Sequence, residues 1–165
     1  MLPKQLKILG SSSYSAIYGM TKLKEIVVPQ SVTVLGGEFS RDCGSLERII
    51  IYGKVVTANV RMGYALQHLN FLVLPDTISS ISHNDAFSRT YALTTIICNA
   101  ATPPALANNN LFAYAGAEQV IYIPDDSVSD YSAGQYWGNY TSRFKTFSQL
   151  REEHPDWYEA YVVKA

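Results

Sequence analysis

The sequence predicts a β-rich solenoid, in which short strands from successive repeats stack in about five rungs beneath an aromatic C-terminal cap and a short helical tail. Two observations support this prediction. Leucines that open similar apolar runs are spaced by 23, 23 and 24 residues. Each run is rich in Val and Ile, which favour strands. A repeat of this length cannot bury its apolar residues alone, so stacked neighbours are expected to cover them.

The repeats begin at Leu23, Leu46, Leu69 and Leu93. Side chains alternate along a strand, so the leucine and the residues three and five positions later are expected to face inward. Pro29 and Pro75 follow their strands and lack the N–H that would continue pairing, whereas Tyr52 takes this place in one repeat. A large apolar residue precedes the next leucine position on a third side of each repeat: Phe39, Met62, Phe87 and Leu111.

The repeats predict a solenoid over residues 1–124, with 1–9 as the second half of a truncated repeat and 120–124 as the last rung. Residues 125–165 are expected to form a cap and helical tail of the same domain. In this tail, Thr146 and Gln149 have the spacing of a capping box. Pro155 is expected to begin a second helix, because proline is tolerated at the first helical position.

The pattern Leu-x-x-Ile-x-Val-Pro, then Val-x-x-Leu, then Phe-x-x-x-Cys resembles the BspA-like leucine-rich repeats of bacterial surface proteins, which are also similar to repeats in bacteriophage and protist proteins. The resemblance covers roughly residues 1–147. Residues 128–131 and 137–140 look like the closing unit of such arrays in gut Bacteroidetes. The resemblance implies a β-rich leucine-rich-repeat solenoid and a role in adhesion or protein binding, with no catalytic residues to carry over.

Composition and spacing argue against several other functions. The formal net charge is −1 and the cations are scattered, so no nucleic-acid partner is expected. No apolar run approaches the roughly 18 residues of a membrane span, so no membrane insertion is expected. His68, His83 and His154 lack metal-ligand spacing, and Cys43 and Cys98 form no Cys-x-x-Cys. Without a nucleophile motif or phosphate loop, we expect a non-enzymatic protein with no metal or cofactor.

The expected partner is another protein, from a host, a virion or a second copy of this chain in a homo-oligomer. The first residues lack the cationic and apolar segments of a secretory leader. The localisation is therefore unknown: the bacterial cell surface is expected if a leader is missing, and otherwise a virion or the cytoplasm.

One outward row is apolar in all five predicted strands: Val27, Ile50, Val73, Ile97 and Tyr122. Three explanations are open for it. Strand propensity alone favours such residues, the tail residues Trp157, Tyr158, Tyr161 and Val162 fold back over the row, or another protein covers it. The third gives our functional hypothesis, a protein-binding and adhesion module. Its predicted binding face comprises Val27, Arg48, Ile50, Phe71, Val73, Ile97 and Tyr122. It predicts that Ile50→Glu leaves the monomer folded but weakens binding.

Two alternative functions remain. A phage virion structural or receptor-binding protein would use the same face, and symmetric assembly would favour it. A carbohydrate-binding module would instead present Tyr136, Trp137 and Tyr140 to a sugar. These rings would be buried if they act as a cap, and burial of three rings stabilises a small end by several kcal/mol at about 25 cal/mol per Å². The cap is the favoured interpretation.

Overall fold

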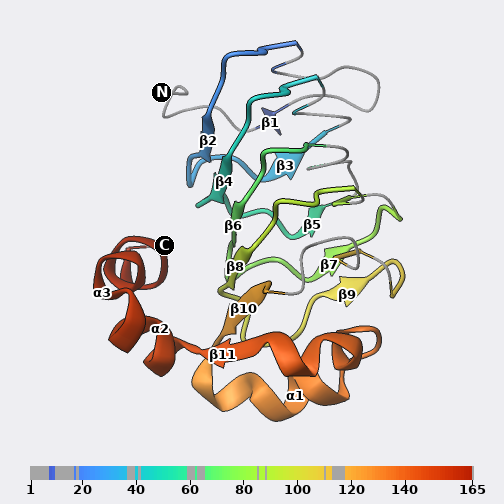
Figure 1. Ribbon diagram of the computed structural model, residues 1–165. Helices are drawn as coiled ribbons and strands as arrows, with labels where there is room; N and C mark the ends of the chain where they lie inside the picture. Colours follow the sequence, from blue (N-terminus) through green and yellow to red (C-terminus); the bar gives the residue numbers. More distant parts are fainter. Residues whose placement is uncertain are drawn as a thin grey trace.

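The main sheet has six parallel strands in the order β11-β10-β8-β6-β4-β2 (Figure 1). The computed structural model describes residues 8–9, 17, 19–36, 40, 42–58, 62, 66–84, 86–87, 89–109, 111–112 and 118–164. The strands of this sheet are β2 (Glu25–Val28), β4 (Arg48–Ile51), β6 (Phe71–Leu74), β8 (Thr95–Cys98), β10 (Val120–Ile123) and β11 (Phe144–Thr146).

Strands one repeat apart are neighbours in this sheet. Arg48 pairs with Glu25 on one side and with Phe71 on the other, and Phe71 pairs with Thr95. The leucine spacing therefore predicts the register of β2, β4, β6 and β8 correctly. The prediction that residues 120–124 form the last rung is wrong, because β11 pairs with β10 beyond it. Ile49 faces the main apolar core and Ile50 the opposite side, as alternation along a strand requires.

Two-residue strands form two smaller parallel sheets. One pairs β1 (Ile8–Leu9) with β3 (Val34–Leu35), and the other contains β5 (Thr57–Ala58), β7 (Ser80–Ile81) and β9 (Ala105–Leu106). Ile8 pairs with Val34, which is the match expected from aligning residues 1–9 with the first complete repeat. The row of short strands is interrupted, because β3 and β5 belong to different sheets.

The chain ends in helical segments. They are η1 (Asp125–Ser127), α1 (Val128–Ala133), η2 (Trp137–Arg143), α2 (Phe147–Glu153), α3 (Pro155–Tyr158) and the π-helical turn η3 (Glu159–Val163). The predicted capping box at the start of α2 is confirmed, since the side chains of Thr146 and Gln149 each accept a hydrogen bond from the other's backbone N–H. Pro155 lies in the first turn of α3, as predicted.

The prediction of a β-rich leucine-rich-repeat solenoid of about five rungs is wrong. The described residues form an open six-stranded parallel sheet, two small separate sheets and helices, an α/β-like arrangement. A parallel sheet is stable when both of its faces are covered. The helices of residues 147–163 supply the second layer, on the face that a solenoid would leave to solvent. Periodicity predicts which strands pair, but it carries no information about such a layer.

One apolar core fills the space between the strands and the remaining turns. Met62, Phe87 and Leu111 are buried in it, whereas Phe39 lies outside the described residues. Cys43 and Cys98 are buried, and no disulfide joins them. The core also contains Tyr131, Trp137 and Tyr140 from the C-terminal part, so residues on both sides of position 124 share it.

Candidate binding face and its C-terminal cover

The predicted apolar row lies on the outward side of the six-stranded sheet, which we call the strand face. Val27 is 40% exposed at one end of the row, and its other members are buried. These buried residues form an apolar cluster that is separate from the main core: Ile50, Phe71, Val73, Ile97 and Tyr122, joined by Phe147 and Leu150 of α2. The row is therefore closed to solvent along most of its length.

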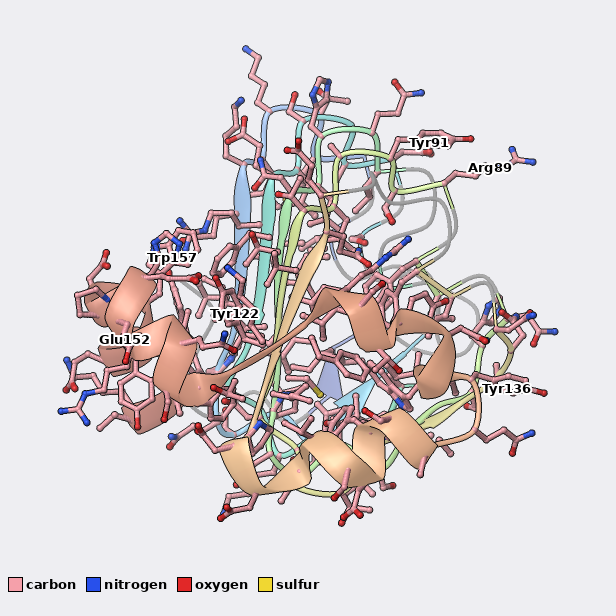
Figure 2. The ribbon with its side chains drawn as sticks, turned by 60° about the horizontal axis from the view of Figure 1, so that its bottom comes forward. Arg89, Tyr91, Tyr122, Tyr136, Glu152 and Trp157 are labelled. Carbon is pink, nitrogen blue, oxygen red and sulfur yellow. The ribbon has the colours of Figure 1, made fainter. Side chains whose placement is uncertain are left out.

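Residues 147–163, which we call the tail, cover the strand face. Trp157, Tyr158, Tyr161 and Val162 are partly buried against the apolar cluster. Trp157 and Tyr122 both lie on the side of the sheet that the tail covers (Figure 2). Of the three explanations for the row, coverage by the tail is the one that the structure shows. Interaction with another protein through these residues stays a hypothesis.

Arg48 and Phe71 hold the outer part of the tail. The Arg48 guanidinium lies 4.5 Å from the centroid of the Phe71 ring, and its terminal nitrogen donates to the Tyr161 hydroxyl. The edge of one ring meets the face of the other between Phe71 and Trp157, with centroids 5.0 Å apart. The Arg48 Nε also lies 3.2 Å from the Glu25 carboxylate, in an ion pair without hydrogen-bond geometry. A cation over an aromatic ring contributes about 0.5–1 kcal/mol at an exposed site and more when desolvated.

Tyr52 and Asn99 bind the tail backbone, and the sequence analysis missed both. The Tyr52 hydroxyl donates to the Ala160 carbonyl at 3.1 Å, and the Asn99 amide donates to the Tyr161 carbonyl at 2.9 Å. The last carbonyls of a helix have no partner within it, so these side chains supply one. A signal was present, because both residues stand where other repeats have proline. Burial is the main cause of the raised pKa of Tyr52.

The beginning of α2 is anchored independently of the outer tail. Phe147 and Leu150 are buried under the sheet. The Ser148 N–H donates to the Asp125 carboxylate at 3.2 Å, so a side chain from η1 supplements the capping box at the N-terminus of α2. Hydrogen bonding from the Ser148 side chain lowers the pKa of Asp125, and the Ser148 N–H adds to this effect.

The end of α2 is tied to the sheet by Glu153. Lys145 Nζ lies 2.7 Å from one Glu153 oxygen, and the Tyr122 hydroxyl donates to the other at 2.8 Å. Hydrogen bonds from Lys145 and Tyr122 lower the pKa of Glu153. Burial, followed by the nearby carboxylate, raises the pKa of Tyr122. Both ends of α2 are therefore held by contacts that do not involve α3 or η3.

The candidate sugar-binding rings Trp137 and Tyr140 lie in the core. They are 1% and 3% exposed, and both donate to backbone carbonyls, Trp137 to Pro104 at 2.7 Å and Tyr140 to Asn109 at 2.6 Å. Tyr136 is half-buried and has a φ of 68°, which places it in the left-handed region. The faces of Trp137 and Tyr140 are thus unavailable for stacking on a sugar.

Other chemistry is not evident in the described part of the chain. No three His, Cys, Asp or Glu side chains there come together to hold a metal ion. No helix in the same ranges has the length and apolar character needed to cross a membrane. A scan against protein-family models and a search of curated proteins find no match. The resemblance to BspA-like repeats therefore stays a prediction from the sequence.

Proposed function

We propose that the chain is a non-enzymatic protein-binding module that acts through the strand face. The observation that carries this proposal is the apolar cluster on that face, which is separate from the main core and packs against a helical segment of polypeptide. The main core contains its own strands, turns and aromatic residues. The strand face is therefore a second apolar surface, and its chemistry suits a helix.

The composition of the contact supports this function. Its centre is aliphatic, with Val73 and Ile97 fully buried, and Arg48, Tyr52 and Asn99 provide hydrogen bonds at its margin. An apolar centre with a polar rim is the usual anatomy of a protein interface. Tyr, Trp and Arg are also the residues that most often dominate binding energy at interfaces. The hydrophobic face of the tail supplies Trp157 and Tyr161 to this contact.

Adhesion at a bacterial surface and receptor binding by a virion protein would both use this face. The sugar-binding alternative has less support, because the Trp137 and Tyr140 rings are buried and hydrogen-bonded to the backbone. We therefore take a helical segment of another polypeptide as the ligand of the strand face.

The test is binding of a labelled peptide with the sequence of residues 154–164, measured by fluorescence anisotropy. The receptor is the full chain carrying Trp157→Ala and Tyr161→Ala, which weakens its own tail contacts. We expect saturable one-to-one binding, with at least tenfold weaker binding to the wild-type chain, whose face is occupied. The matched control is the peptide carrying the same two alanines, which should not bind. Absence of binding to a receptor in which the amides of residues 155–163 exchange rapidly while β4 and β6 stay protected would refute the proposal.

A further inference from the structure

The tail has two parts that are held in different ways. Phe147 and Leu150 of α2 are buried, whereas α3 and η3 contain no buried residue. We call residues 155–163 the strap. Its contacts with the rest of the chain include those with Arg48, Phe71, Tyr52 and Asn99. Release of the strap would therefore leave α2 in place.

The direction of the strap is set at His154 and Pro155. The His154 N–H closes α2 by donating to the Leu150 carbonyl at 2.8 Å. Pro155 has no N–H to continue the helix, and it disfavours helical geometry in the residue before it. His154 accordingly has φ −142° and ψ 70°. The Trp157 and Tyr158 N–H groups then donate back to the His154 carbonyl, each at 3.0 Å, and start the strap in a new direction.

We propose that a second copy of this chain can supply the strap, so that two copies exchange residues 155–163 about His154 and each strap fills the other's strand face. This proposal rests on the proposed function, binding of a helical segment by the strand face. A second copy fits because its strap has the same aromatic residues and carbonyls that the face already binds. Exchange costs little free energy of interaction, because each contact within one chain is replaced by the identical contact between two chains.

Exposed apolar residues also suit a second copy as the occupant. Val27 at one end of the apolar row is 40% exposed, and Val163 at the end of the strap is 56% exposed. Both residues stay in water when the strap comes from the same chain. In an exchanged dimer two chains lie together, so residues of this kind gain a second chain against which they can be buried.

The experiment is size-exclusion chromatography with light scattering on the full chain and on Pro155→Ala, over a range of concentrations. Alanine restores an N–H and allows α2 to continue through position 155, which directs the strap away from its own sheet. We expect Pro155→Ala to double in mass from the 18.3 kDa of the monomer. Adding Trp157→Ala and Tyr161→Ala should return it to the monomer, because exchange needs these rings. Pro155→Gly is the matched control, since it opens the hinge without favouring a continuous helix.

Two results would overturn the exchange. One is a Pro155→Ala chain that stays monomeric, whether its strap amides are protected or exposed to exchange, and the other is a dimer that survives loss of both rings. Should Pro155→Ala fail to fold, as judged by the emission of the buried Trp137, the same comparison of mass with and without the rings is made in Pro155→Gln, because glutamine also restores the N–H and favours a continuous helix. Peptide binding separates the two proposals: a peptide that binds while the chain stays monomeric rejects exchange alone, and a peptide that does not bind rejects the binding function as well.

Discussion

Replacing Ile50 by glutamate is expected to release the strap while the rest of the chain stays folded. Ile50 is 3% exposed and lies in the apolar cluster beneath the tail. Its neighbour Ile49 is fully buried in the main core on the other side of the same strand. The two substitutions are identical in chemistry and differ only in which side of the sheet receives the charge.

The magnitude follows from what each charge can do to reach water. Losing a buried isoleucine costs about 1.5–3 kcal/mol, and an unpaired carboxylate in an apolar site adds a penalty of several kcal/mol. At position 50 the chain avoids that penalty by releasing a strap with no buried residue. At position 49 the charge can reach water only if the sheet separates from the main core. That separation costs the unfolding free energy of a domain, about 5–15 kcal/mol.

Hydrogen–deuterium exchange resolved by peptide distinguishes these outcomes. We expect Ile50→Glu to lose protection in residues 155–163 and to keep it in β4 and β6, whereas Ile49→Glu loses protection in the strands as well. Urea unfolding should give a much lower midpoint for Ile49→Glu. The reasoning fails if the two variants lose equal stability, or if Ile50→Glu exposes the strands together with the strap.

Three further outcomes can be measured. Tyr52→Phe and Asn99→Ala each remove one hydrogen bond to the strap, worth about 0.5–1.5 kcal/mol. Amide exchange in the strap should therefore become up to about tenfold faster in each variant. Unchanged exchange would show that these hydrogen bonds do not hold the strap against the sheet. The pKa of Glu153 is lowered in the folded chain. The carboxylate therefore stabilises the fold at pH values above the ordinary glutamate pKa of about 4.3, and this stabilisation is lost as the pH falls through the folded pKa. Protection of α2 should therefore drop in acid, and less steeply in Glu153→Gln; parallel pH profiles would contradict this. A Cβ at Gly53 would lie 2.6 Å from a backbone oxygen, so Gly53→Ala should cost about 1–3 kcal/mol in urea unfolding. Gly44→Ala should be close to neutral, because no atom of the described residues lies within 4 Å of the added carbon.

Much of the main sheet was predictable from local patterns. The leucine spacing identified which strands pair, and alternation along Arg48–Ile51 placed Ile49 and Ile50 on opposite faces. The capping box at Thr146 and the start of α3 at Pro155 were also predictable. These features depend on groups close together in the chain or on a simple repeat, so a linear sequence contains the information they require.

The candidate site was only half predictable. The apolar row was visible as a set of residues, and Trp157, Tyr158, Tyr161 and Val162 were named as one possible cover. The choice among tail, partner and solvent was left open, because burial of apolar surface is favourable whichever apolar group provides the cover. Tyr52 and Asn99 were missed, because a side chain in place of proline can donate its hydrogen bond only when the fold brings a carbonyl of a distant helix beside it.

The fold class was also decided by the helical layer that the tail forms over the strand face. A period of 23 or 24 residues describes how strands follow one another, and a solenoid satisfies it as well as the observed sheet does. The break at Pro155 and the hydrogen bonds at Glu153 and Asp125 direct the tail onto the strand face, where it completes the second layer. Pairing within the sheet thus follows from the repeat, and the cover follows from contacts between segments far apart in the chain, from Asp125 with Ser148 at a separation of 23 to Tyr52 with Ala160 at a separation of 108. Contacts at that separation depend on the folded positions of both segments, which no local pattern encodes.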